Sequence, residues 1–127
     1  MVENAAETVK YLASRYALYC ASNAPAGQQE HRMEKAGLAP FFKNMFISGN
    51  IDLFKPSAEF FDYCLNNMPG YQKDEVLMVG DNLRADIEGA ITYGFSTCYF
   101  NIRNKKEITD IKPTYTITSL SELINIL

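Results

Sequence analysis

Apolar residues recur along the chain in two alternating patterns, short continuous runs and stripes with helical spacing. The short runs predict buried strands at 16–21, 44–48, 76–79, 96–100 and 114–118. The stripes predict helices near the N-terminus, over 28–37, from Ser57, after Asp81 and at the C-terminus. Parallel neighbours need crossover connections of about a dozen residues, usually a helix. The alternation therefore predicts an α/β fold, a Rossmann-like parallel sheet with helices on both faces.

The stripes also predict which side chains face the core. The first helix places Ala5, Ala6, Val9, Leu12 and Ala13 on one face, with Asn4 as a possible cap. The helix after Asp81 places Leu83, Ile87, Ala90 and Ile91 on one side and ends at Gly94. The last helix turns Leu120, Leu123, Ile124 and Leu127 inward. Each helix is thus expected to cover the sheet with one apolar face.

Composition limits the class of protein. A chain of 127 residues that is 47% hydrophobic fits one domain around one core. A net charge of −3 without a basic stripe argues against a nucleic-acid partner. No run approaches the roughly 18 apolar residues of a membrane span, and the start lacks the apolar core of a signal peptide. Three cysteines in apolar runs, Cys20, Cys64 and Cys98, indicate buried thiols, so we expect a soluble cytoplasmic protein.

Polar residues follow two of the predicted strands directly. Ser22 and Asn23 follow the strand over 16–21, and Asp81 follows Gly80 at the end of the strand over 76–79. Ligands of open parallel sheets bind outside the carboxyl ends of the strands, so these side chains should share one crevice. Ser22 and Asn23 are equally compatible with a simple helix cap and with an anion seat.

A lysine and a second acid complete the candidate constellation. Lys55 precedes Pro56, which restricts its backbone, and Asp86 lies early in the helix after Asp81. A carboxylate at the tip of a buried strand needs backbone donors or a cation such as Mg²⁺, and two acids beside one lysine favour a cation site. His31 lies on a polar helix surface and is given no role.

Three segments, taken in order, resemble motifs II, III and IV of the haloacid dehalogenase-like hydrolase superfamily: LYCASNA, FKPSAEFF and LMVGDNLRADIEGA. The sequence is also similar to the pyrimidine 5′-nucleotidase branch of this superfamily. Two segments carry this similarity, MEKAGLAPFFKNMFISGNIDLFKPSAEFF and STCYFN. The resemblance implies that residues 1–127 are the C-terminal portion of the core. It also implies that Ser22, Asn23 and Lys55 bind the substrate phosphate, that Ser22 and Lys55 assist catalysis, and that Asp81 and Asp86 serve Mg²⁺.

One family element is missing from the sequence. The family's nucleophile and its general acid and base are the aspartates of a DxD motif near the N-terminus, and no DxD occurs here. The resemblance therefore implies part of an Mg²⁺-dependent phosphohydrolase that forms an aspartyl-phosphate from a small phosphorylated metabolite, such as a nucleoside 5′-monophosphate. This chain alone is expected to be inactive, and to associate through its open sheet or with the missing N-terminal half. A non-catalytic phosphate and cation-binding module, a dehalogenase and a phosphomutase remain alternatives.

Overall fold

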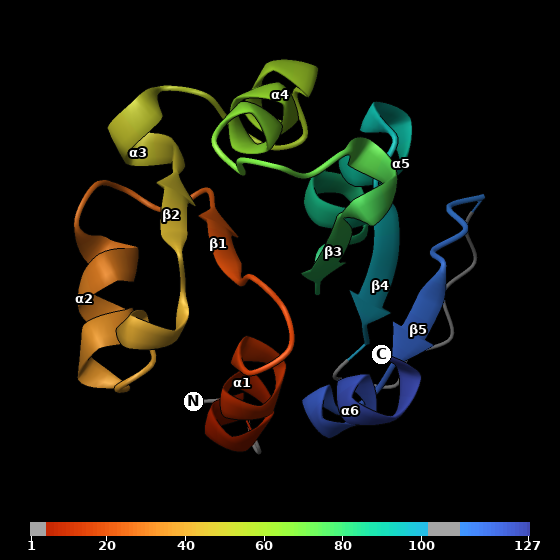
Figure 1. Ribbon diagram of the computed structural model, residues 1–127. Helices are drawn as coiled ribbons and strands as arrows, with labels where there is room; N and C mark the ends of the chain where they lie inside the picture. Colours follow the sequence, from red (N-terminus) through yellow and green to blue (C-terminus); the bar gives the residue numbers. More distant parts are fainter. Residues whose placement is uncertain (1–4, 102–109) are drawn as a thin grey trace. The chain divides into compact units, whose positions relative to one another are not determined.

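The strands of the protein pair in two separate parallel sheets. The structure is a computed structural model, and it describes residues 5–101 and 110–127. One sheet contains β1 and β2, and the other has the order β3-β4-β5 (Figure 1). Every pairing between these strands is parallel, which confirms the predicted α/β class. The chain divides into two compact units, residues 1–53 with 120–127 and residues 54–119, and each is described in turn.

Unit 1, residues 1–53 and 120–127, holds the two-stranded sheet. Its elements are α1 (Ala5–Ala13), β1 (Tyr19–Ser22), α2 (Gln28–Lys35), β2 (Asn44–Ile47), α3 (Ser48–Ile51) and α6 (Leu123–Ile126), with short 3₁₀ turns at Ala39–Phe41 and Leu120–Glu122. In the register, Tyr19 pairs with Asn44 and Ser22 with Ile47. The buried apolar residues are Ala5, Leu12, Met33, Leu38, Phe46, Ile47 and Leu123.

Unit 2, residues 54–119, holds the three-stranded sheet. Its elements are α4 (Ala58–Asn66), β3 (Leu77–Gly80), a π-helical turn (Leu83–Glu88), α5 (Gly89–Tyr93), β4 (Ser96–Phe100) and β5 (Tyr115–Ile117), with a 3₁₀ turn at Lys73–Glu75. An aromatic cluster fills the space between α4 and α5, where Phe61 lies 5.5 Å from Phe60, 6.0 Å from Tyr93 and 5.9 Å from Phe95 between ring centroids. Phe60, Phe61 and Phe95 are buried, so three of these four rings belong to the core of this unit.

The first predicted strand begins later than its apolar run suggests. Tyr16 is exposed, and its backbone N–H donates to the Leu12 carbonyl at 2.7 Å. The residues after α1 thus still satisfy the last carbonyl groups of that helix, and the strand starts only at Tyr19. Asn4, the predicted cap of α1, lies outside the described residues. The polar Thr8, which the apolar stripe omitted, is buried in α1.

Two predicted core positions are wrong, each for a local reason. Ile91 is 39% exposed because the preceding turn is π-helical, with the Ile87 N–H donating to the Asn82 carbonyl at 3.3 Å. A wider turn shifts the angular positions that 3.6-residue spacing predicts, and of the two adjacent predicted positions Ala90 is buried whereas Ile91 is exposed. Leu127 is 38% exposed because α6 ends at Ile126. Gly94 ends α5 as predicted, with a left-handed φ of 115° that favours glycine.

Each sheet keeps an edge strand with a single partner. Among the described residues, β1 pairs with β2 alone, and β3 pairs with β4 alone. All four residues of β3 are apolar or glycine, yet all are only half-buried, whereas four of the five residues of β4 are buried. An apolar edge strand with unpaired backbone groups is a natural site for a further strand.

Candidate functional site

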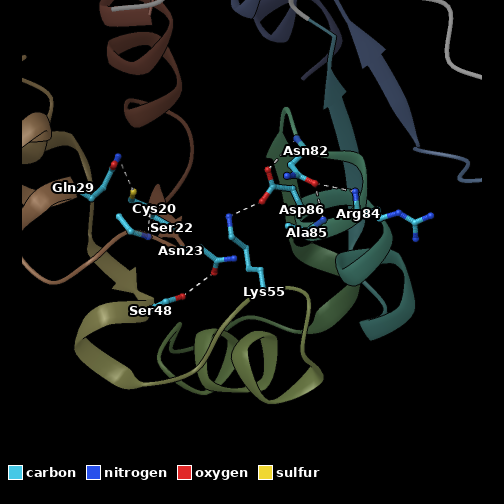
Figure 2. A network of polar contacts seen from close by, with 11 residues as sticks. Cys20, Ser22, Asn23, Gln29, Ser48, Lys55, Asn82, Arg84, Ala85 and Asp86 are labelled. Atoms are coloured by element: carbon cyan, nitrogen blue, oxygen red, sulfur yellow. Dashed lines mark hydrogen bonds and ion pairs between the residues drawn. The ribbon is translucent and has the colours of Figure 1, made fainter.

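A buried ion pair joins the lysine of one predicted motif to an aspartate of another. Lys55 Nζ lies 2.5 Å from Asp86 Oδ1, and both side chains are more than nine-tenths buried (Figure 2). The two residues are 31 positions apart in sequence and both belong to unit 2. A buried charge needs a partner of opposite sign, so each of these groups fixes the position of the other.

Gly80 and Asn82 shape the strand end around Asp86. A Cβ atom on Gly80 would lie 2.5 Å from Asp86 Cγ and closer still to Asp86 Oδ2, so only glycine leaves room for this carboxylate. The Asn82 N–H donates to Asp86 Oδ2 at 3.3 Å. The Asn82 side chain in turn accepts from the N–H groups of Arg84 and Ala85, at 3.1 and 2.9 Å, and caps the π-helical turn. Asp86 is therefore held on both of its oxygens.

The loop that carries Lys55 is held against α5. A Cβ atom on Gly89 would lie 2.7 Å from Pro56 Cβ and 2.8 Å from Phe61, so the first turn of α5 contacts the loop directly. Ser57 caps α4, because its hydroxyl accepts from the Phe60 N–H at 3.3 Å. Pro56 and Ser57 thus lie between two fixed helices, and this holds the backbone of Lys55 in place.

Burial also affects a neighbouring thiol in unit 2. Loss of hydration raises the pKa of Cys64 in α4 to about 12, against a smaller opposing effect of the Lys55 ammonium. The thiol therefore stays protonated near neutral pH, and it is not a nucleophile there. Among the described residues the three cysteines form no disulfide, and Cys64 and Cys98 are buried as predicted whereas Cys20 is only half-buried.

Asp81 stands between Gly80 and Asn82, directly after β3. Unlike Asp86, it is exposed to solvent. No group of three or more His, Cys, Asp and Glu side chains suited to a metal gathers in residues 5–101 and 110–127. Mg²⁺ prefers oxygen ligands, keeps several waters and is commonly held by one or two carboxylates, so an exposed Asp81 beside a buried Asp86 fits this ion chemically.

Ser22 and Asn23 form a second polar group, in unit 1; Ser22 is the last residue of β1, where the sequence predicted it to follow the strand, and Asn23 comes directly after it. The Ser22 hydroxyl accepts from the Ala24 N–H at 3.2 Å, and Asn23 Oδ1 accepts from the Ser48 hydroxyl at 2.8 Å (Figure 2). Ser22 is half-buried and Asn23 is exposed. A hydroxyl that accepts from an N–H two residues later is a local contact that helix caps also make. The contact therefore fits both the helix cap and the anion seat that the sequence left open.

The structure brings some of the predicted site residues together. It pairs Lys55 with Asp86, places Asp81 five residues before Asp86 at the end of β3, and places Ser22 beside Asn23 at the end of β1. These two groups belong to different units, so the single crevice that would unite them stays a prediction. His31 is exposed on α2. Sequence reasoning missed Gly80, Asn82, Gly89 and Ser48, whose roles depend on contacts with residues distant in sequence or on close packing.

No helix among residues 5–101 and 110–127 has both the length and the apolar character that crossing a membrane requires. Parallel sheets whose strand ends carry polar side chains place the protein among the Rossmann-like α/β proteins. Residues 1–94 match the family described as haloacid dehalogenase-like hydrolase, and the chain therefore belongs to that family.

Named relatives are similar to the chain over most of its length. It is 35% identical over all of its residues to the HAD-hydrolase YfnB of Bacillus subtilis, of which it covers 54%. The crystal structure of that protein bound to magnesium superposes with a TM-score of 0.96 over 99% of this chain and 55% of that one. The pyrimidine 5′-nucleotidase PynA of Streptococcus pneumoniae is 35% identical over 88% of the chain, and YjjG of Escherichia coli is 36% identical over 84%. The chain spans about half the length of these relatives, 54% of the first and 47% of the other two.

Proposed function

We propose that the chain is the phosphate- and metal-binding part of an Mg²⁺-dependent phosphohydrolase. The observation that carries the proposal is the buried Lys55–Asp86 pair beside the exposed Asp81 at the end of β3. A phosphoryl group in transfer carries negative charge on its oxygens, and an ammonium, a cation and hydrogen-bond donors are the groups that stabilise it. Lys55 supplies the ammonium, and Ser22 and Asn23 supply donors.

The acidic residues have different tasks in this proposal. Asp81 is exposed and would ligate Mg²⁺ directly, and the metal would neutralise charge on the transferring group. Asp86 already accepts from Lys55 and from the Asn82 N–H, so it would hold the lysine in place and add negative charge behind the metal. This division follows from the exposure of Asp81 and the burial of Asp86.

The attacking carboxylate lies outside these residues in the proposed mechanism. An aspartate of a DxD motif attacks the phosphorus, the leaving oxygen takes a proton from the second aspartate, and water then hydrolyses the aspartyl-phosphate. The strand that carries this motif would pair with the open edge of β3, which the half-buried apolar residues of β3 favour. The chain alone would therefore hydrolyse no phosphate ester.

The substrate is a small phosphate monoester, and a nucleoside 5′-monophosphate is the first compound to test. Two relatives at 35% and 36% identity are named pyrimidine 5′-nucleotidases, which supports this choice. The magnesium bound in the crystal structure of the Bacillus subtilis relative supports the choice of metal.

The test is the Asp81→Asn variant of the enzyme completed with a DxD-bearing N-terminal half. Loss of one anionic ligand should lower activity on nucleoside 5′-monophosphates by about two to three decades and raise the Mg²⁺ concentration needed for half activity. The exposed Asp74→Asn serves as the matched control and should retain activity. Equal activity and Mg²⁺ response in Asp81→Asn and the unaltered enzyme would refute the metal role. A complete enzyme that binds phosphate without turning over any ester would favour a non-catalytic binding module.

A further inference from the structure

Two loops of unit 1 are fastened together at the carboxyl ends of β1 and β2. Ser48, the first residue of α3, is fully buried, and its hydroxyl donates to Asn23 Oδ1 at 2.8 Å across 25 residues of sequence. The Gly49 N–H donates to the Ala24 carbonyl at 3.1 Å. A Cβ atom on Gly49 would lie 2.7 Å from the carbonyl carbon of Pro25, so the two loops touch through their backbones. This close contact leaves the Ser48 hydroxyl little freedom to move.

The bond from Ser48 determines which end of the Asn23 amide faces away from it. An asparagine amide carries an acceptor oxygen at one end and two N–H donors at the other. With Oδ1 held by the buried hydroxyl, the N–H donors lie at the opposite end, on a side chain that is exposed to solvent. The buried hydroxyl therefore stabilises this orientation of the amide.

Phosphate oxygens only accept hydrogen bonds, so they need the donor end of the amide. We infer that Ser48 is a positioning residue, which presents the donor end of the Asn23 amide to the phosphate of the substrate. The inference rests on the proposed function, because it takes the phosphate to bind at Ser22 and Asn23. Ser48 itself is fully buried and so does not touch the substrate.

The experiment measures binding of inorganic phosphate to this chain by isothermal titration calorimetry. The Ser48→Ala variant should bind phosphate about three- to tenfold more weakly, the effect of one misdirected hydrogen-bonding group. Asn23→Ala should weaken binding at least as much. The double variant should match Asn23→Ala alone, because Ser48 acts only through that amide.

A matched control separates positioning from stability. Thr97 in β4 is also a fully buried hydroxyl, and it accepts from the Thr114 N–H at 3.2 Å in unit 2. Thr97→Val should lower the melting temperature, as Ser48→Ala should, yet leave phosphate affinity unchanged. Asn23→Asp should bind phosphate more weakly than Asn23→Ala, because its carboxylate opposes the anion.

The outcomes distinguish the inference from the proposed function. Phosphate affinity that is unchanged in Ser48→Ala but reduced in Asn23→Ala would overturn the positioning role alone. A further loss when Ser48→Ala is added to Asn23→Ala would also overturn it, because the hydroxyl would then act by another route. Absence of phosphate binding by the unaltered chain would overturn the proposed phosphate seat and the positioning role with it.

Discussion

At the scale of single residues, charge is distributed unevenly between the inside and the surface of unit 2. The Lys55–Asp86 pair is more than nine-tenths buried, whereas the Arg84–Glu88 pair, at 3.5 Å, leaves the arginine side chain 83% exposed. Water screens the exposed pair and cannot screen the buried one. Both pairs involve residues of the π-helical turn Leu83–Glu88. A comparison of the two therefore shows how burial changes the contribution of an ion pair to stability.

We predict that Lys55→Met and Asp86→Asn each lower the free energy of unfolding by about 3 kcal/mol, since each leaves a buried charge without its partner of opposite sign. The double variant should lose less than the sum of the two single changes. Arg84→Ala should cost less than about 0.5 kcal/mol. Urea unfolding in EDTA measures all four proteins without a contribution from bound metal. Equal losses in Arg84→Ala and Lys55→Met would contradict the role assigned to burial.

At the scale of the elements, α5 and the Lys55 loop are in direct contact at Gly89. We predict that Gly89→Ala lowers the free energy of unfolding by about 1–3 kcal/mol, because the added methyl group overlaps Pro56 and Phe61. Thr92→Ala, at an exposed position of the same helix, is the control and should change stability by less than about 0.5 kcal/mol. Urea unfolding compares the two. An unchanged free energy of unfolding in Gly89→Ala would mean that the Lys55 loop moves away from α5 without loss of stability, and would contradict the prediction.

The buried face of α4 leads to a dependence of stability on pH. The pKa of the folded Cys64 thiol is raised from 9.0 to about 12 by burial, so the unfolded chain holds fewer protons between these values. The contribution of this thiol to the free energy of unfolding therefore falls as the pH rises from about 9 towards 12. Cys64→Ser removes the ionisable group, and its urea stability should decline less steeply from about pH 8 to about pH 10.5. Identical slopes for the two proteins would contradict the raised pKa.

The helices and strands also show how much of the fold could be predicted from the sequence alone. The apolar runs predicted every strand that the structure describes, because burial on both faces leaves a strong signal in composition. The ends were less exact, since the hydrogen bonds of a preceding helix decide where β1 begins. The π-helical turn was not predicted at all, because one extra residue in a turn changes the angular position of Ile91 without changing composition.

The residues of the candidate site also divide into those that the sequence indicates and those that only the structure reveals. An acid after a strand and a lysine before a proline pointed to Asp81, Asp86 and Lys55, since charged residues are unexpected beside apolar runs. Ser48 gave no such signal, because its partner Asn23 is 25 residues away and only the folded chain brings them together. Gly80 and Gly89 are likewise informative only once the atoms next to them are known.

At the scale of the whole molecule, we predict that the purified chain hydrolyses no nucleotide or sugar phosphate, even with Mg²⁺. In the proposed mechanism its side chains would bind the substrate phosphate and Mg²⁺, but none matches the attacking carboxylate. The assay compares the chain with Lys55→Ala at equal concentration over a panel of esters. Turnover that disappears in Lys55→Ala would show that a residue of this chain is the nucleophile. The proposal that the attacking carboxylate lies outside these residues would then be wrong.

The two units differ in how their residues are distributed along the chain. Unit 2 is one continuous segment, Phe54–Ser119, whereas unit 1 combines Met1–Leu53 with Leu120–Leu127, and α1 packs against α6. A ribosome releases the N-terminus first, and a continuous segment folds as soon as it has emerged. Unit 2 is therefore complete before residues 120–127 emerge, whereas unit 1, most of which emerges earlier, still lacks that segment. Removal of residues 120–127 would leave unit 2 intact and α1 without its helical partner α6, so the folding of unit 1 depends on residues that follow unit 2 in the sequence.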